Sequence, residues 1–432
     1  MKPDDKIYQD YLSILQEELI AATGCTEPIA IAYAAAKARE VLGARPESCM
    51  IKASGNVIKN VKSVVVPNTN GLRGIPAAAA AGIVAGDASR KLEVLGIVSA
   101  QDKTRIQNYL ETHPLTVEPA VNKSIFYIEV TVKGYGNEAT VMIQHYHTNI
   151  VCITRNQAVI YQSHSETDDK NGLTARDCLN VREIVDFCES VRLEDIASVI
   201  GRQIDYNSAI SAEGLENTWG ANIGKVLLAA YGNDVRTRAR AAAAAGSDAR
   251  MGGCEKPVVI VSGSGNQGMA ASLPVIEYGK ELKSSRDKLY RAVALSDLVT
   301  IHQKTGIGRL SAYCGAVSAG CGAGAGIAYL HGGDYDMIAH TIVNSVAITS
   351  GIICDGAKPS CAAKISAAVD AGILGFNMYK NDQQFISGDG IVTKGVDNTI
   401  HNVGLLAKEG MRQTDQEIIK IMLNQPQTAN SK

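Results

Sequence analysis

Cysteines at the two ends of a short loop are the residues of this chain whose type and spacing best suit chemistry. Cys354 and Cys361 enclose six residues, among which Gly356 and Pro359 prevent a continuous helix. Two thiols at the ends of such a loop can converge on one metal, and the second of them opens a predicted helix over 361–374. The pattern therefore points to a metal site or to a pair of reduced thiols.

Two further cysteines lie upstream and compete for a third position in such a site. Cys314 lies 40 residues before Cys354, and Cys321 follows in a run of small residues. Neither spacing matches the C-x2-C pairs of zinc sites or the cysteine runs of ferredoxins. Spacing alone therefore favours buried thiols over a metal site. Buried thiols are also the ordinary interpretation of Cys49, Cys152, Cys178, Cys188 and Cys254.

Cys25 lies between the end of one predicted helix and the start of the next, with Gly24 before it and Thr26-Glu27-Pro28 after it. The N–H groups and the dipole at a helix N-terminus stabilise an anion, which favours a thiolate. The charge of Glu27 works against that thiolate. Position alone therefore fits a functional thiol and a buried thiol equally well.

Polar loops that enter helices are candidates for holding an anion. Ser262–Gly268 could direct several N–H groups at a carboxylate or phosphate, and Asn68–Gly71 resembles it loosely. Arg250 could hold a carboxylate with two hydrogen bonds, although a structural pair with an Asp suits it at least as well. His147 ends a strand-like stretch, where a lone His is more often structural than catalytic. Each signal is weak by itself.

The elements that must position these residues begin with an amphipathic helix over 7–20, which Gly24 ends. The predicted elements that follow are a helix over 26–42, strands over 50–53 and 62–66, a turn over 67–71 and an Ala-rich helix from Pro76.

The middle of the chain changes from helical to strand-like patterning. Apolar residues alternate over 126–132, as on one face of a strand. The predicted elements are a helix over 100–112 and extended segments over 126–132, 140–154 and 158–162. Together they indicate a small α+β unit, a β-meander, at 90–168, with the polar and acidic segment 163–172 as its exit linker.

From about residue 175 the pattern is helical and rich in Ala and Gly, whose small side chains let helices pack closely. The stretch 312–330 is long enough to question as a membrane span but too weakly apolar, so we expect a buried helix. The predicted fold class is α+β. A predominantly helical catalytic core, residues 1–89 and 169–432, carries the small α+β unit in its first half.

The composition limits the class of protein. A chain of 432 residues, 46% of them hydrophobic, can bury a large core, and its length suggests two or three domains. A formal net charge of -2 gives no argument for nucleic acid. The start, Met1–Asp5, lacks the apolar stretch of a signal peptide. We therefore expect a cytoplasmic chain whose ten cysteines are reduced or bind metal.

Five motifs in one order resemble those of the bacterial and archaeal L-cysteine desulfidases, which are related to the α-chain of the iron–sulfur L-serine dehydratases. Each motif alone is modest, but five over nearly the whole chain are highly specific. They are Gly24-Cys25-Thr26-Glu27-Pro28, His147-Thr148-Asn149-Ile150, Ser247-Asp248-Ala249-Arg250-Met251-Gly252-Gly253, Ser262-Gly263-Ser264-Gly265-Asn266-Gln267-Gly268 and Cys354-Asp355-Gly356-Ala357.

The resemblance implies a [4Fe–4S] cluster held by three cysteines, one well upstream of a closer pair. This pattern carries over to Cys314, Cys354 and Cys361, with Cys321 as the rival for the first position. Some serine dehydratases also use a cysteine at the extreme C-terminus and carry a regulatory domain. This chain has no cysteine after Cys361, and no such domain is evident. The resemblance thus covers the catalytic core and leaves regulation open.

The implied activity is a β-elimination from L-cysteine, giving pyruvate, ammonia and hydrogen sulfide, or from L-serine, giving pyruvate and ammonia. An open iron position would act as a Lewis acid. Cys25 is the candidate base or a labile fourth ligand. The partner is a small amino acid, without nucleic acid or membrane, and a homo-oligomer stays open. The residues implied to hold the substrate are Thr26, Asn68, Thr69, Asn70, Gly71, His147, Asn149, Ser262, Ser264 and Asn266.

Two other functions stay open. A pyridoxal-phosphate lyase of the same reaction would use Ser262–Gly268 for the phosphate and Lys304 or Lys358 for the Schiff base, but it leaves the cysteines unexplained. A non-catalytic sensor of amino acids or redox state could use the same cluster. A broad iron–sulfur absorbance that oxygen bleaches distinguishes the cluster from pyridoxal, and turnover distinguishes the enzyme from the sensor.

Overall fold

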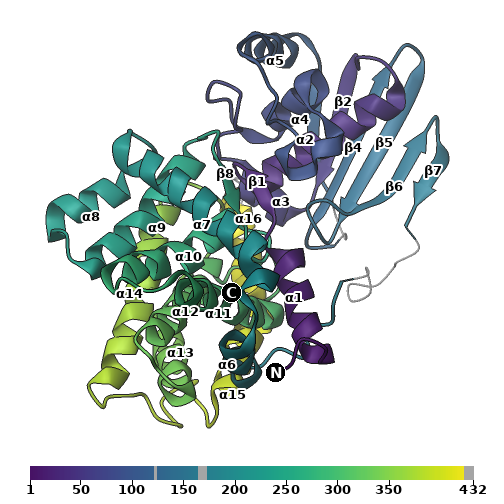
Figure 1. Ribbon diagram of the computed structural model, residues 1–432. Coiled ribbons are helices and arrows are strands. Elements are labelled where there is room, and N and C mark those ends of the chain that lie inside the picture. Colours follow the sequence, from purple (N-terminus) through teal and green to yellow (C-terminus); the bar gives the residue numbers. More distant parts are fainter. Residues whose placement is uncertain (121–123, 164–172, 423–432) are drawn as a thin grey trace, which may run out of the picture.

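A computed structural model of the protein describes residues 1–120, 124–163 and 173–422. A large helical body lies beside a smaller unit built on a six-stranded sheet (Figure 1). This arrangement confirms the predicted α+β class with a helical majority. Apart from Ser163, the linker expected at 163–172 lies outside the described residues.

The elements follow one another as strands mixed with helices in the first part and as helices in the second. The strands are β1 (Ala21–Thr23), β2 (Ser48–Ala53), β3 (Leu115–Pro119), β4 (Tyr127–Gly134), β5 (Asn137–Gln144), β6 (Ile150–Arg155), β7 (Ala158–Gln162) and β8 (Pro257–Val259). The helices are α1 (Lys6–Glu18), α2 (Thr26–Leu42), α3 (Gly55–Val61), α4 (Gly74–Ala85), α5 (Ala100–Thr112), α6 (Val181–Ser190), α7 (Leu193–Glu216), α8 (Ile223–Tyr231), α9 (Val235–Met251), α10 (Gly265–Glu281), α11 (Arg286–Ile307), α12 (Gly315–Leu330), α13 (Tyr335–Thr349), α14 (Cys361–Lys380), α15 (Val396–Leu405) and α16 (Arg412–Met422), with the short turns η1 (Ala88–Glu93) and η2 (Leu406–Gly410).

The larger sheet has the strand order β3-β2-β4-β5-β6-β7, in which β2 and β3 are parallel and the other pairs antiparallel. The alternating residues Ile128, Val130 and Val132 are fully buried, as the pattern predicted. Helices α2 and α4 pack against this sheet (Figure 1). Because β2 and both helices precede residue 90, the sheet unit draws on the start of the chain. A division of the chain at 90 and 168 stays a prediction.

Two predicted strands differ from the structure. No strand forms over 62–66: α3 ends at Val61, and of this segment Val65 makes one isolated bridge, to Arg73. A valine run this close to Pro67 is extended but has no neighbouring strand along its length. The segment 140–154 is not continuous either, because a turn that includes His145 with φ 65° separates β5 from β6. Strand propensity alone did not locate that turn.

Helix α12 lies at the centre of the helical body, packed against α10, α11, α13 and α14. Small residues make this possible. A Cβ added at Gly320 would lie 2.3 Å from the carbonyl oxygen of Ala368, and one at Gly372 would lie 2.1 Å from that of Gly320. The backbones of α12 and α14 are therefore in direct contact, and the stretch expected as a buried helix is one. Within the described residues no helix is both long and apolar enough to cross a membrane.

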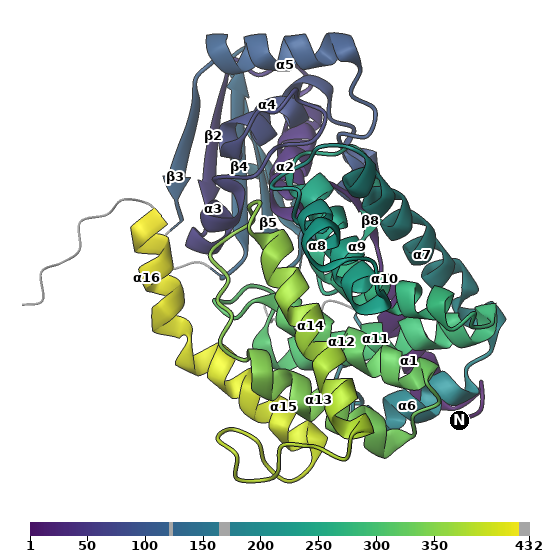
Figure 2. The ribbon, with the colours of Figure 1, turned by 90° about the vertical axis from the view of Figure 1, so that its left-hand side faces the viewer.

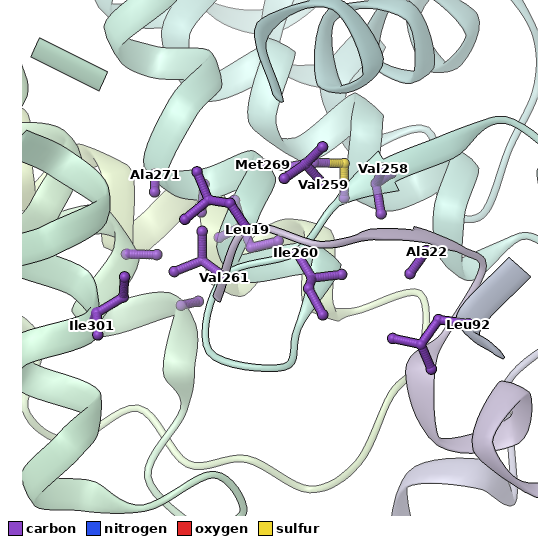
Figure 3. Close-up of a cluster of buried hydrophobic side chains, with 14 of the residues drawn as sticks. Leu19, Ala22, Leu92, Val258, Val259, Ile260, Val261, Met269, Ala271 and Ile301 are labelled. Atoms are coloured by element: carbon purple, nitrogen blue, oxygen red, sulfur yellow. The ribbon is translucent and has the colours of Figure 1, made fainter. Parts of the chain in front are cut away.

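A two-stranded junction ties the beginning of the chain to the helical body. Strand β1 pairs antiparallel with β8, so that Ala22 lies opposite Val258. Figure 3 shows the apolar side chains around this pair, among them Leu19, Val259 and Met269, all of which are buried. Because β1 leads into α2 and β8 leads toward α10, this junction fixes the starts of those two helices side by side.

Candidate active site

A cavity lies where four helices begin. Cys25, Ser264 and Cys314 are the residues immediately before α2, α10 and α12, Cys361 is the first residue of α14, and all four line the cavity. Within the described residues, the side chain of the N-cap residue accepts no hydrogen bond from the first turn at any of these helix starts. The first N–H groups of a helix lack partners inside it and carry the positive end of its dipole. The walls of the cavity therefore favour negative charge.

The cavity brings together most of the residues that the motifs singled out. These are Cys25, Thr26, His147, Ser262, Ser264, Asn266, Cys314, Cys354 and Cys361. They come from both parts of the molecule, since His147 follows β5 in the sheet unit and the last three cysteines belong to the helical body.

Five of the predicted substrate-binding residues lie elsewhere. Of the described residues, the lining leaves out Asn68, Thr69, Asn70, Gly71 and Asn149. The side chain of Asn68 donates to the carbonyl of Leu95 at 2.8 Å, and that of Asn149 donates to the carbonyl of Gln144 at 3.0 Å. Asn68 therefore links its loop to the segment at Leu95, and Asn149 stabilises a local turn. The Asn68 loop lies behind the Gly24–Cys25 segment, where Pro67 contacts Gly24.

Cys314 and Cys354 are held beside each other by paired backbone. The Cys314 N–H donates to the carbonyl of Ile352 at 3.1 Å, and the Cys354 N–H donates to that of Ala312 at 2.6 Å. An antiparallel bridge between Tyr313 and Ile353 lies between these bonds. Two segments that α12 and α13 separate in the sequence thus present their thiols to one cavity.

Cys361 and Cys25 are the other two cysteines that line the cavity. Cys361 opens α14 as predicted, with its N–H donating to the carbonyl of Lys358 at 3.0 Å. It packs against a small buried cluster that contains Cys25 and Met251. A left-handed Gly356, φ 93°, lets the intervening loop approach α3, because an added Cβ there would lie 2.4 Å from the Lys59 carbonyl oxygen.

Cys321 lies apart from this group. It is fully buried in α12, and its thiol points at the carbonyl of Ile342 at 3.6 Å. Of the described residues, the cavity lining includes Cys314 and leaves out Cys321. Between the two rivals for the third position, the geometry therefore favours Cys314.

Burial favours the protonated form of two of the cavity thiols, Cys314 and Cys361. It raises the pKa of Cys314 to about 12, and the charge of Cys354 adds to the effect. Burial also raises the pKa of Cys361. A bound metal would have to displace these protons. Among the described residues, no three His, Cys, Asp or Glu side chains are arranged to hold a single metal ion.

Glu27 is the acceptor around which one wall of the cavity is organised. It accepts hydrogen bonds from the Cys25 thiol at 3.2 Å, the Thr26 hydroxyl at 3.1 Å and the Asn60 amide at 3.0 Å. The His147 Nε2 lies 3.8 Å from its Oε1, a charge contact too long for a hydrogen bond. Burial opposes ionisation, but His147 and the Cys25 donor outweigh it and hold the pKa of Glu27 at about 2.

The helix start does not by itself favour an ionised Cys25, because two other effects oppose it. Burial and the neighbouring Glu27 charge raise the pKa of this thiol well above its usual range, and the opposing effect of Arg250 is smaller. In the ligand-free cavity Cys25 is therefore a thiol that donates to Glu27. The sequence placed Cys25 correctly before α2, but it could not show that the residue is 2% exposed.

Basic residues complete the lining. Lys304 is buried, makes no hydrogen bond or ion pair within the part of the chain described, and burial lowers its pKa to about 8. Lys59 belongs to α3 and pairs with Asp415 of α16 at 2.6 Å. The two helices lie side by side in Figure 2. Of the two lysines considered for a Schiff base, Lys304 lines the cavity and Lys358 pairs instead with Asp355.

Several lining residues escaped the sequence analysis. Glu27 was considered only as a charge that disfavours a thiolate, although its place after Cys25 at the start of an apolar helix was a usable signal. Gln267 belongs to the Ser262–Gly268 motif but was not singled out within it, and Asn60 and Tyr313 carry no local pattern that separates them from ordinary polar residues. They reach the cavity through packing between distant elements.

Comparison with known proteins places these features in one family. The family described as serine dehydratase alpha chain matches residues 89–420. A UPF0597 protein of Desulfitobacterium hafniense is 60% identical over 425 residues, which cover 98% of this chain and 99% of that protein. UPF0597 proteins of Lachnoclostridium phytofermentans and Treponema denticola are 50% and 43% identical, over 97% and 98% of this chain and the full length of each relative.

Proposed function

The chain belongs to the family of the serine dehydratase alpha chain, and on that premise we propose that it is a lyase that eliminates the β-substituent of a small L-amino acid. The proposed substrate is L-cysteine, which would give pyruvate, ammonia and hydrogen sulfide; L-serine is the second candidate. One observation carries the proposal: cysteines 25, 314, 354 and 361 come from distant segments and line a single cavity at four helix starts.

The donor set of the cavity suits an iron–sulfur cluster. Thiolates are the usual ligands of such clusters, and Cys314, Cys354 and Cys361 supply three of them. A cluster of four irons spaces its ligands more widely than a single ion does, which agrees with thiols that share a cavity without closing around one point. Unfilled helix starts would stabilise the three thiolates once their protons leave. When bound, such a cluster supplies a Lewis-acidic iron for the substrate's carboxylate and leaving group.

The remaining residues would bind and orient the amino acid. Ser262, Ser264 and Asn266 stand at the uncapped start of α10 and suit a carboxylate. Glu27, with Thr26 and His147 beside it, supplies the negative charge that an α-ammonium group needs. The α-carbon would then lie next to Cys25, between the two groups.

The proton transfer assigned to Cys25 follows from this placement. The Sγ of Cys25 would accept the α-proton while the bond from the β-carbon to sulfur breaks and hydrosulfide leaves. The resulting aminoacrylate tautomerises and takes up water, giving pyruvate and ammonia. An α-ammonium group near Glu27 would offset the charge that keeps Cys25 protonated and so favour its ionisation on substrate binding.

Anaerobic reconstitution with iron and sulfide, followed by assays for sulfide and pyruvate, tests the proposal. We expect a broad absorbance that air bleaches, together with both products from L-cysteine. The same cluster without turnover on L-cysteine or L-serine would indicate a sensor and contradict the lyase.

The position of Lys304 favours the pyridoxal-phosphate lyase as the second candidate. Its buried amine lies in the cavity, and its lowered pKa suits Schiff-base formation. A sharp pyridoxal band in the purified protein, with activity that survives air and is lost in Lys304→Ala, would establish that alternative instead.

A further inference from the structure

Arg250 and Lys304 are the two basic residues of the cavity lining whose charge no carboxylate of the described residues balances, and of the two only Arg250 is a guanidinium. Three other basic lining residues each lie near a carboxylate: Lys59 at 2.6 Å from Asp415, Arg309 at 3.1 Å from Glu18 and His147 at 3.8 Å from Glu27. Within the described residues no carboxylate pairs with Arg250. Its side chain is nevertheless among the largest fully buried ones of the protein, with the residue 2% exposed.

Neutral groups hold the Arg250 guanidinium in place. Its Nε donates to the carbonyl of Gly24 at 3.0 Å, and its Nη1 donates to the Asn266 side chain at 3.1 Å. The group rests against the first residue of α10, because a Cβ added at Gly265 would lie 2.5 Å from Nε. Of the nitrogens described here, Nη2 has no hydrogen-bond partner, and the residue lines the cavity.

A buried guanidinium requires a negative partner. Burying an unpaired charge is costly. The adjoining wall is also incomplete: Gln267, 5% exposed, has an Oε1 without a hydrogen-bond partner, and the Ser264 side chain does not cap α10. A fixed cation and an uncapped helix start thus face the same space as an amide oxygen that lacks a donor, and a carboxylate with a neighbouring hydrogen-bond donor would satisfy all three.

We propose that Arg250, together with the start of α10, binds the α-carboxylate of the amino-acid substrate. This inference rests on the proposed function for the identity of the ligand. The Arg250 Nε donates a hydrogen bond to the carbonyl of Gly24. A carboxylate bound to the free Nη2 would therefore lie beside the next residue, Cys25, and would direct the α-carbon toward its thiol. Arg250 also sets specificity: the ligand needs an ionised carboxylate, and an amide in its place is rejected.

Calorimetric titration of the anaerobically reconstituted protein with L-alanine tests the inference. L-Alanine has the carboxylate and ammonium groups but no β-leaving group, so binding is measured without turnover. We expect wild type to bind L-alanine and to bind L-alaninamide, which lacks the carboxylate, about 100-fold more weakly. Arg250→Gln should weaken L-alanine binding by a similar factor, and Arg250→Lys, which keeps the charge but loses the planar fork, by less.

Arg240→Gln is the matched control. Arg240 belongs to the same helix but pairs with Asp370 at 3.6 Å, so its variant should bind L-alanine as wild type does. The single tryptophan, Trp219, gives a second readout, since it packs against Gly252, two residues beyond Arg250. Its fluorescence should respond to L-alanine in wild type and not in Arg250→Gln.

Three results would overturn the inference: equal affinity of wild type for L-alanine and L-alaninamide, no binding of L-alanine, or wild-type affinity in Arg250→Gln. The first comparison uses wild type alone, so it decides the matter even if Arg250→Gln does not fold. L-Alanine binding that depends on Arg250, in a protein that fails to convert L-cysteine or L-serine, would contradict the proposed lyase and leave the carboxylate site intact.

Discussion

Two groups of helices in this protein differ in how they begin, while others, among them α1 and α7, lack a side-chain cap away from the cavity. Five helices, away from the cavity, start with a side chain that accepts a hydrogen bond from the first turn: Ser99 for α5, Asn180 for α6, Asp234 for α9, Ser285 for α11 and Asp334 for α13. The four helices that meet at the cavity start with Cys25, Ser264, Cys314 and Ser360, whose side chains make no such bond in the part of the structure described. A cap satisfies the helix locally and stabilises the fold. An open helix start gives up that stability and offers its N–H groups to a ligand.

The largest effect should come from the three cavity cysteines of the helical body, two of which lie at open helix starts. Cys314→Ser, Cys354→Ser and Cys361→Ser should each lose nearly all iron and lower turnover by several orders of magnitude, because a serine hydroxyl replaces a thiolate ligand. Iron content and sulfide release measure both effects. Cys321→Ser is the control, since Cys321 lies outside the cavity lining, and it should keep its iron. Loss of iron in Cys321→Ser with retention in Cys314→Ser would reverse the assignment.

Cys25→Ser should separate catalysis from cofactor binding. The hydroxyl can still donate to Glu27, so we expect fold and iron content to remain. Turnover should fall by several orders of magnitude. A serine hydroxyl is far too weak an acid to ionise, so it cannot accept the α-proton as a thiolate would. Anaerobic kinetics with a quantified cluster provide the measurement. Near-normal turnover of Cys25→Ser would mean that Cys25 only packs in the cavity lining and takes no part in catalysis.

The stability that a buried carboxylate gives a neighbouring helix should depend on pH with the opposite sign to that of an exposed N-cap carboxylate. Asp248 of α9 accepts from the N–H groups of Ala221 and Gly224 at the start of α8, and burial raises its pKa to about 6. Its folded pKa lies above the unfolded value of 3.8, so the folded state binds the proton more tightly. Relative to Asp248→Asn, wild type should therefore lose stability, on the order of 2 kcal/mol, as pH rises from about 4 to 6 and change little above.

The surface cap Asp234 should show the opposite sign. The Thr237 N–H lowers its pKa, so wild type should gain stability over Asp234→Asn as pH rises through the acidic range. Urea unfolding at a series of pH values measures both differences. Equal pH dependence of the two pairs would refute the distinction between the buried and the exposed cap.

The smallest effect compares two serines in equivalent positions. Ser285 accepts from the Lys288 N–H at 3.3 Å, so Ser285→Ala should cost about 1 kcal/mol of unfolding free energy and leave turnover unchanged. Ser264 makes no cap bond, so Ser264→Ala should leave stability within about 0.5 kcal/mol of wild type while weakening substrate binding. An equal loss of unfolding free energy in both variants would mean that the Ser264 side chain does cap α10.

The sequence predicted what local chemistry decides. Gly24 and Pro28 mark the start of α2, and Pro359 with Ser360 marks the start of α14 at Cys361, because backbone restrictions act within a few residues. The five motifs also indicated the family that comparison then showed. They could not show that Cys314 and Cys354 are neighbours, since the bridge between Tyr313 and Ile353 depends on how α12 and α13 fold back.

Burial and long-range contacts account for the errors. The Asn68 loop resembles the Ser262 loop in composition, but the first supports the wall from behind and the second lines it. A dipole argument for a Cys25 thiolate overlooked desolvation, which is a property of the whole fold. For Arg250 the sequence left a ligand carboxylate and a structural pair with an Asp both open, because the absence of a paired carboxylate around it in the described residues is visible only in three dimensions.

The pairing of the segments that carry Cys314 and Cys354 also determines when this site can fold during protein synthesis. A chain emerging from the ribosome exposes Cys25 hundreds of residues before the second of those segments exists, and domains generally fold from the N-terminus as they appear. The bridge forms only after α13 has been synthesised and has turned back on α12. The thiols of Cys314 and Cys354 therefore become neighbours only in a nearly finished polypeptide.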